Sequence, residues 1–266
     1  MEHSIRQYLG KPVRLGKRLL CYEELDSTNT RAKELALAGA EDGTVVIANG
    51  QTAGRGRMDR AFQSPGGKGL YLTVLLRPKA PVERLACVTA LAGVAVCGAV
   101  EAVCGIRPGL KWPNDPVLGG RKLCGILTEL VLMPDGSPAV ALGIGINVLQ
   151  TPEDFSPELR TIATSLLQEL ERPVSRERLA AELLRWLEPA YDALERGVWP
   201  DWTEQYRTDC VHLGRPVRLV GPNGQETVMA LDIDETFGLV VEGADGRLRT
   251  VRSGELSVRG LLGYAD

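Results

Sequence analysis

The sequence predicts an α+β fold in which a larger mixed-sheet domain is followed by a small β-barrel. Strand-like apolar runs alternate with helical runs through most of the chain, which is typical of a mixed α/β domain. From about Leu213 the pattern changes to short β-runs separated by turn sequences such as Asp245-Gly246. A chain of 266 residues has room for one full core and a small second domain, which we assign to residues 1–211 and 212–266.

Helical periodicity predicts helices over residues 29–38, 82–103 and 175–196. We expect a bend or a break near Pro189, because proline removes a backbone donor and clashes with the preceding turn. Residues 85–100 are apolar on all sides but short for a bilayer, so we expect a buried core helix. In the C-terminal part, a turn is expected at Pro222-Asn223-Gly224, and the predicted strands are residues 216–220, 227–233, 238–242 and 247–251.

A loop with two arginines, Gly54-Arg55-Gly56-Arg57, lies between the predicted strands 44–48 and 70–76. Glycines let backbone N–H groups converge on an anion, and the guanidinium groups of Arg55 and Arg57 stay charged at any working pH. The loop therefore predicts a site for a carboxylate or a phosphate. A solvated surface turn is the alternative, because the spacing matches neither a dinucleotide fingerprint nor a Walker loop.

A second polar segment runs from Lys111 to Asp115. Pro113 and Pro116 disfavour helical geometry in the residues before them, which fixes Asn114 and Asp115 on a stiff extended connection. A turn at residues 119–120 then leads the chain into the next predicted strand.

On that strand, Lys122 carries an ammonium group where apolar side chains are otherwise expected. A period of two places Lys122 on the same face as Cys124 and Ile126. A solvated or snorkelling lysine is the alternative. The neighbouring amide and carboxylate of residues 114 and 115 favour a binding site.

A third strand has two contrasting faces. Large apolar side chains lie on one of them, at Leu142, Ile144, Ile146 and Val148. The other face is nearly bare and ends in an amide, with Ala141, Gly143, Gly145 and Asn147. Such a surface leaves room for a flat ligand and a hydrogen bond to its edge, while tight helix packing over small residues is the alternative.

Taken together, these motifs resemble the biotin protein ligase family. The resemblance is carried, in order and spacing, by Asp26-Ser27-Thr28-Asn29, Gly54 to Arg57 with Ser64-Pro65 and Gly69-Leu70-Tyr71, Lys111 to Asp115, Arg121-Lys122-Leu123 with Gly125-Ile126-Leu127, and Gly143 to Asn147. It covers most of residues 22–148. It implies a mixed-sheet catalytic domain of the biotin/lipoate ligase type, followed by an SH3-like β-barrel that assists nucleotide and carrier binding; a bare structural cap is the alternative.

The resemblance also implies a two-step reaction with biotin and ATP as substrates. The biotin carboxylate attacks the α-phosphate to give biotinyl-5'-adenylate, and a lysine of an apo biotin carboxyl carrier protein domain of a carboxylase then takes the biotin. Mg²⁺ would be carried on the ATP phosphates, because the sequence shows no carboxylate cluster for a metal site.

The same resemblance assigns site residues. The catalytic residues are Lys122 and Arg57, where Lys122 holds the carboxylate and phosphate and Arg57 closes over the adenylate. The biotin site is expected to comprise Ser27, Thr28, Asn29, Gln51, Gly54, Arg55, Gly56, Arg57 and Lys122. The nucleotide site is expected to comprise Lys111, Asn114, Asp115 and Asn147. Helix capping is the alternative role for Ser27, and Asp115 is the nearest candidate for a general base.

Two positions depart from the family pattern. Asp59 stands where glycine is usual, and Phe62 stands where tryptophan is usual. Asp59 places an anion beside an anion-binding loop, and we expect it to weaken the loop or to pair with Arg55 or Arg60.

Composition reduces the number of functional classes that remain. A net charge of −3 gives no electrostatic reason to expect nucleic acid as a partner. Six cysteines without a C-x-x-C pair, and no secretory leader, predict reduced thiols in the cytoplasm and no membrane association. With His3 and His212 as its two histidines, the chain is a poor candidate for a histidine zinc site or a Ser-His-Asp triad. We expect a monomer or a weak homodimer.

Two other functions remain open. Lipoate or octanoate attachment shares the fold, although the motifs at residues 54–57 and 111–115 favour biotin. Some biotin ligases also repress transcription through an N-terminal winged helix. Because 26 residues precede Ser27, fewer than the roughly 40 of an independently folding unit, we expect this DNA-binding function to be missing.

Overall fold

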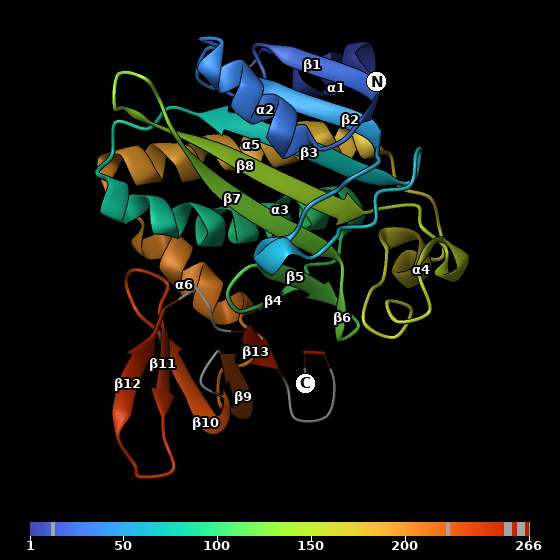
Figure 1. Ribbon diagram of the computed structural model, residues 1–266. Helices are drawn as coiled ribbons and strands as arrows, with labels where there is room; N and C mark the ends of the chain where they lie inside the picture. Colours follow the sequence, from blue (N-terminus) through green and yellow to red (C-terminus); the bar gives the residue numbers. More distant parts are fainter. Residues whose placement is uncertain (12–13, 222–223, 253–256, 260–263, 266) are drawn as a thin grey trace.

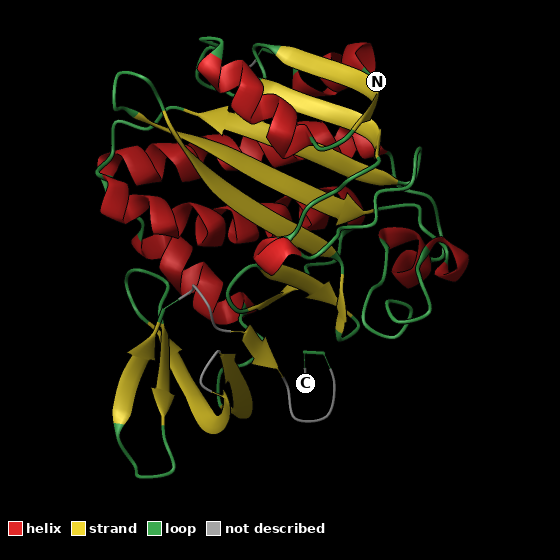
Figure 2. Ribbon diagram, in the orientation of Figure 1, coloured by secondary structure: helices red, strands yellow, loops and turns green. Residues whose placement is uncertain are grey.

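The computed structural model describes residues 1–11, 14–221, 224–252, 257–259 and 264–265. Its centre is a five-stranded mixed sheet with the order β1-β2-β3-β8-β7, in which β1 and β2 are parallel and the other pairs are antiparallel. The strands are β1 Leu19–Leu25, β2 Val45–Gln51, β3 Gly69–Leu76, β7 Cys124–Leu132 and β8 Pro138–Asn147. Helices cover both faces of this sheet (Figure 2). The predicted α+β fold is confirmed.

The alternation of side chains along the strands explains the layers. In β2, Val45 and Ile47 enter the main core, which contains α3 (Val88–Cys104) and α5 (Arg176–Arg196), while Val46 packs against α2 (Thr28–Leu37) on the other face. Figure 1 shows α2 on one side of the sheet and the α3–α5 pair on the other.

The other elements of the first part surround this core. They are α1 Glu2–Leu9, η1 Arg57–Asp59, η2 Val82–Cys87, β4 Gly109–Lys111, β5 Asp115–Leu118, β6 Arg121–Lys122, η3 Pro152–Asp154, α4 Leu166–Leu170 and α6 Pro200–Asp209. β4, β5 and β6 form a small three-stranded sheet. Lys111 ends β4, Asp115 begins β5 and Lys122 ends β6, so this sheet positions the polar segment 111–115 and Lys122.

The helix predictions are largely confirmed. The first predicted helix is α2, and the second is a 3₁₀ turn, η2, that continues into α3. The span Val82–Cys104 is long and apolar enough to cross a membrane by length and composition, but 72% of its apolar 18-residue window is buried inside the protein. The third helix, α5, continues through Pro189, so of the expected bend or break the break is wrong and the bend stays a prediction. Buried side chains on both sides of the proline, Leu187 and Ala190, hold the helix against the core and offset the cost of the lost hydrogen bond.

The C-terminal part forms a five-stranded antiparallel sheet among the described residues, with the order β12-β11-β10-β9-β13. Its strands are β9 Arg215–Gly221, β10 Gly224–Ile233, β11 Leu239–Glu242, β12 Leu248–Val251 and β13 Ser257–Arg259. The four predicted strands are confirmed, whereas β13 was not predicted. Of the predicted turn at Pro222-Asn223-Gly224, the first two residues lie outside the described part.

The C-terminal sheet is bound to the segment that carries the polar motif. Trp112 Nε1 donates a hydrogen bond of 2.9 Å to the carbonyl oxygen of Phe237, and Tyr206 packs its ring against the same phenylalanine. Val211 N donates to the carbonyl of Leu110. His212 follows directly and is completely buried, and neither ring nitrogen has a hydrogen-bond partner among the described residues.

The contact between α3 and α5 yields a stability prediction. A Cβ on Gly98 would lie 2.6 Å from Trp186 Cδ2, whereas a Cβ on Gly93 in the same helix would meet only the two methyl groups of Leu110 within 4 Å, the nearer at 3.2 Å. Both Gly→Ala changes gain about 1 kcal/mol of helix propensity, but Gly98→Ala forces the indole to move. We expect Gly98→Ala to be less stable than Gly93→Ala by about 1–3 kcal/mol in urea unfolding. Equal stability of the two variants would contradict this packing.

Burial of His212 yields a pH prediction. Loss of water, followed by repulsion from Lys111 and Arg215, lowers the pKa of His212 from 6.5 to about 4. Between these values the unfolded chain binds a proton that the folded chain does not bind, so stability falls as the pH drops through this window and is unaffected by this group above it. We expect His212→Leu to abolish about 3 kcal/mol of the loss in unfolding free energy between pH 7 and pH 4. His3→Leu, at an exposed position of α1, is the control; parallel curves for wild type and His212→Leu would refute the prediction.

Candidate functional site

The main cavity has a volume of about 610 Å³ and opens where the loop after β2 meets the 111–115 segment. The loop crosses the sheet near β7 and β5, as its cyan ribbon shows in Figure 1. The charged side chains described in the lining are five cations and one carboxylate, from Arg55, Arg57, Arg60, Lys111, Lys122 and Asp115. A cavity with this charge distribution is suited to a polyanion.

Lys122 is held at the centre of this lining. Its Nζ donates a hydrogen bond of 2.7 Å to Asp115 Oδ1. Its backbone is fixed on both sides, because Lys122 N donates to the carbonyl of Ile162 and Thr164 N donates to the carbonyl of Lys122. Burial by itself would raise the pKa of the Asp115 carboxyl, but Lys122 and Lys111 outweigh that effect and hold the pKa below its usual range. Asp115 is therefore an anion that orients Lys122.

The expected orientation of Lys122 is wrong. The strand is interrupted at Leu123 between β6 and β7, so the period of two does not carry across the break. Cys124 and Ile126 point into the main core, whereas a Cβ on Gly125 would lie 3.5 Å from Lys122 Cε. The ammonium thus shares the face of Gly125, which is the bare face of the sheet.

Arg57 bridges the loop and the polar segment. Its Nη1 donates to Asn114 Oδ1 at 3.0 Å, and Asn114 Nδ2 donates to the carbonyl of Ile126 at 2.7 Å. Burial lowers the pKa of Arg57, and attraction from Asp115 opposes this effect. Arg57 also lines a second cavity of about 370 Å³, so its side chain lies between the two cavities.

Lys111 is almost completely buried, at 5% exposure, and its Nζ lies 3.8 Å from the centre of the Tyr264 ring. A cation over an aromatic face is stabilised by the ring quadrupole. Lys111 therefore contributes positive charge from the floor of the cavity.

A smaller pocket adjoins the cavity beneath the loop. Its lining brings together the predicted residues Ser27, Thr28, Asn29, Gln51 and Arg55 with Phe62, Tyr71, Gly125, Leu127, Gly143, Ile144 and Gly145. The pocket is small, at about 30 Å³, which is room for about two water molecules. The predicted faces of β8 are confirmed, because Leu142, Ile144 and Ile146 enter the main core on the far side.

Phe62 closes this pocket. A Cβ on Gly145 would lie 2.6 Å from Phe62 Cε1, and one on Gly125 would lie 3.1 Å from Phe62 Cε2. The ring thus lies directly on the bare backbone of β7 and β8. A ligand can enter only if Phe62 moves aside.

Hydrogen bonds fix the polar end of the pocket. Gln51 Oε1 accepts from both the backbone and the hydroxyl of Thr28, and Gln51 Nε2 donates to Ser64 Oγ. Asn29 Oδ1 accepts from Thr73 Oγ1, and Asn29 Nδ2 donates to Glu129. The side-chain amides of Gln51 and Asn29 are therefore each held in one orientation.

Ser27 occupies the N-cap position of α2, but its hydroxyl makes no cap hydrogen bond. The first N–H of the helix, that of Thr28, instead donates to Gln51 Oε1 at 2.8 Å. The buried hydroxyl of Ser27 therefore faces the pocket lining without a capping role.

Packing and internal hydrogen bonds fix the loop glycines. A Cβ on Gly54 would lie 2.3 Å from the carbonyl oxygen of Phe62, so no larger residue fits there. The N–H of Gly56 donates to the carbonyl of Arg60 and is not directed at an anion, because the loop folds back on itself through the Arg55–Ala61 bridge. Arg55 pairs with Glu129 at 3.3 Å and lines both the cavity and the small pocket. The side chain of Asp59 lies outside the described part, so its expected pairing stays a prediction.

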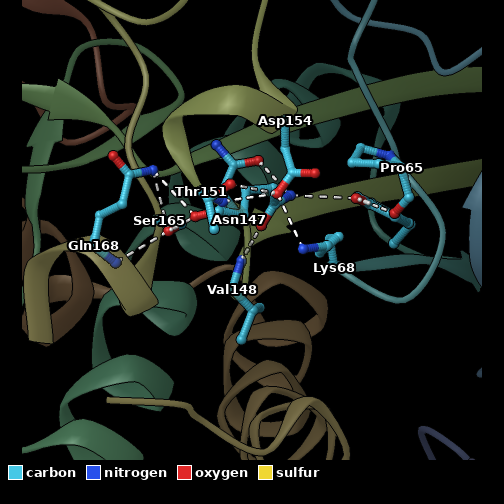
Figure 3. Close-up of polar contacts among 10 residues, drawn as sticks. Pro65, Lys68, Asn147, Val148, Thr151, Asp154, Ser165 and Gln168 are labelled. Carbon is cyan, nitrogen blue, oxygen red and sulfur yellow. Dashed lines mark hydrogen bonds and ion pairs between the residues drawn. The ribbon is translucent and has the colours of Figure 1, made fainter. Parts of the chain in front are cut away.

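Asn147 ends the bare face and lines the large cavity. Its Nδ2 donates to the carbonyl of Thr164, and its Oδ1 accepts from Gln150 Nε2. Figure 3 shows the surrounding network, in which Ser165 and Gln168 donate to the backbone carbonyl of Gln150 and Lys68 pairs with Asp154. The amide is locked at the nucleotide side of the predicted site.

Several site residues were not found from the sequence. Glu129 and Thr73 hold Asn29, and Tyr264 and Val258 close the cavity from the C-terminal part. Their spacing in the sequence carries no signal, because only tertiary contacts bring them to the cleft. Among the described residues, no group of three or more His, Cys, Asp or Glu side chains is placed to hold a metal ion.

Comparison with known proteins agrees with this geometry. Residues 22–148 match the biotin/lipoate A/B protein ligase family, and residues 212–259 match the biotin protein ligase C terminal domain. The chain is 39% identical to the bifunctional ligase/repressor BirA of Bacillus subtilis, covering 92% of this chain and 75% of that protein. It is 36% identical to the biotin–[acetyl-CoA-carboxylase] ligase of Mycobacterium tuberculosis, covering 96% of this chain and 94% of that protein.

Among solved structures, the biotin protein ligase from Aquifex aeolicus in complex with biotin and ATP is similar with a TM-score of 0.81 and 31% identity, covering 92% of this chain and 99% of that chain. The resemblance found in the sequence is thus confirmed by sequence relatives and by fold. The chain belongs to the biotin protein ligase family of enzymes.

Proposed function

We propose that the protein activates biotin with ATP to form biotinyl-5'-adenylate and transfers the biotin to a lysine of a biotin carboxyl carrier protein domain of a carboxylase. The observation that carries this proposal is the junction of two compartments. A small pocket with a fixed polar end adjoins a larger, cation-lined cavity. Arg55, Phe62, Gly125 and Leu127 line both, and Lys122 and Arg57 line the larger one. Relatives named as biotin ligases and a neighbour bound to biotin and ATP support it.

In the first step, a carboxylate oxygen of biotin attacks the α-phosphorus of ATP. The new bond joins this oxygen to phosphorus, the bond between the α-phosphorus and the bridging oxygen breaks, and pyrophosphate leaves. Two anions must approach each other, so Lys122, Lys111 and Arg57 lower the barrier by neutralising the developing charge. Mg²⁺ would be held by the ATP phosphates, since Asp115 in the cavity is already paired with Lys122.

The small pocket suits the ureido ring of biotin. This ring has donors and acceptors, and the pocket offers the hydroxyl of Ser27 with the pre-oriented groups of Thr28, Asn29 and Gln51. Phe62 would leave the bare glycine surface to admit the ring and then cover it. Gly54 and Gly56 shape the loop rather than contact the ligand.

In the second step, the neutral amine of the carrier lysine attacks the carbonyl carbon of the mixed anhydride. An amide bond forms, the bond to the phosphate oxygen breaks, AMP leaves and the amine loses a proton. Asp115 is a weak candidate for the base, because Lys122 and Lys111 lower its pKa and its lone pairs are engaged. We assign contact with the nucleotide to Asn114 and Asn147, which line the large cavity.

Attachment of lipoate or octanoate is the second candidate function. The dithiolane ring of lipoate has no N–H or carbonyl groups to pair with the polar end of the pocket. A site built around such groups rejects ligands that leave them unpaired. The structure therefore favours biotin over lipoate.

The proposal is tested by transfer of labelled biotin to a purified apo carrier domain with ATP and Mg²⁺, in the presence and absence of excess lipoate. We expect transfer to require ATP and to be insensitive to lipoate. Lys122→Ala should lower adenylate formation by at least about a hundredfold, because a cation that neutralises the transition state is lost. Lys17→Ala, at an exposed position, is the matched control. Lipoate transfer without biotin transfer would overturn the assignment.

Arg57 yields a separate prediction about water exclusion. Its contact with Asn114 closes the loop over the cavity, and an exposed adenylate is hydrolysed. We expect Arg57→Gly to form adenylate but to release it into solution before transfer. Chromatography of free and bound adenylate measures the effect, with Arg247→Gly, at an exposed turn of the C-terminal part outside the cavity, as the control. If the variant retains the adenylate as well as the wild type does, Arg57 does not have this role.

A further inference from the structure

The C-terminal part of the chain reaches the reaction centre through Tyr264. Its hydroxyl donates a hydrogen bond of 2.5 Å to Asp115 Oδ2, while Lys122 Nζ donates to Oδ1 of the same carboxylate at 2.7 Å. Tyr264 therefore contacts one oxygen of the carboxylate, and Lys122 contacts the other.

We propose that Tyr264 is a positioning residue for adenylation: its hydroxyl fixes the Asp115 carboxylate, and the carboxylate in turn fixes the ammonium group of Lys122. This inference rests on the function proposed above. It assigns to the C-terminal domain a direct effect on the central cation of the site, beyond forming one wall of the cleft.

Three observations support this relay. Asp115 connects to Lys122 at a distance typical of a strong charge-assisted hydrogen bond, so the position of one group dictates that of the other. The next residue along the chain, Ala265, is 3% exposed, so the chain directly after Tyr264 is packed against the protein. Val258 of β13 lines the same cavity, so the tail and the sheet approach the cleft together.

The ring of Tyr264 has a second role. It lies over Lys111 Nζ, so this one side chain acts on two lysines of the site. It contacts Lys111 directly and is connected to Lys122 through Asp115. Removing the hydroxyl alone leaves the ring over Lys111 and frees one oxygen of Asp115. The carboxylate can then rotate, and Lys122 loses the fixed geometry that an in-line attack requires.

The chain provides a matched control for this pair of contacts. Tyr191 donates its hydroxyl to Asp42 at 3.1 Å and carries the guanidinium of Arg14 over its ring at 3.9 Å. Neither Tyr191 nor Asp42 lines the large cavity. Tyr191→Phe therefore removes the same kind of hydrogen bond, from a tyrosine that also lies under a cation but outside the cavity; Tyr191 is buried, whereas Tyr264 is half-buried.

The test is biotin-dependent exchange of pyrophosphate into ATP by the full chain, with kcat and KM measured for wild type, Tyr264→Phe, Tyr264→Leu and Tyr191→Phe. We expect Tyr264→Phe to lower kcat about tenfold, the usual effect of a lost hydrogen bond to a charged group, with the KM for ATP within about twofold of wild type. Tyr191→Phe should change neither constant by more than about twofold. In an Asp115→Asn background, Tyr264→Phe should cause no further loss.

Other outcomes overturn the relay. Wild-type kcat in Tyr264→Phe, or a raised KM for ATP confined to Tyr264→Leu, would make Tyr264 only a wall of the nucleotide cavity. Independent, multiplicative losses in the double variant would show that Tyr264 does not act through Asp115. Wild-type protein without biotin-dependent exchange would refute the proposed function itself, and the inference with it. Because Tyr264→Phe keeps the ring packed, the comparison stands even if Tyr264→Leu fails to fold.

Discussion

The pairing of Asp115 with Lys122 is the interaction on which the cleft depends. Five cationic side chains described in the lining face one another across a cavity, and their mutual repulsion would open it if nothing opposed them. Among the described side chains, Asp115 at the centre and Glu129, which pairs with Arg55, compensate this charge only in part. The remaining positive potential attracts a polyanionic ligand. The same repulsion between cations destabilises the cleft when no ligand is bound.

A second constraint is the bare surface of β7 and β8. Because Gly125, Gly143 and Gly145 carry no side chain on that face, α2 and the loop can approach the backbone itself at these three positions. Asn29 fits where a Cβ on Gly143 would stand, and Phe62 fits where one on Gly145 would stand. The pocket is thus defined by main chain on one side and by two inserted side chains on the other.

Much of this arrangement follows from local sequence. Alternation along residues 141–148 predicted the two faces of β8, and the turns after residue 213 predicted most of the second sheet, because both depend on periods of two to four residues. Three features did not follow. α5 continues through Pro189 since packing of its buried face outweighs the proline, Lys122 changes face because the strand breaks at Leu123, and Tyr264 meets Asp115 only through tertiary folding. Each depends on contacts between distant residues, which no local pattern encodes.

The glycine surface also limits how substrate choice can change during evolution or engineering. Its depth is set by backbone atoms, which point substitutions cannot move outward, and any larger residue there collides with Asn29 or Phe62. In the proposed binding mode, variation in the size of the accepted ring is therefore confined to the opposite wall, above all to position 62. A library for ligases that accept bulkier ring analogues would gain most from small residues at that single position.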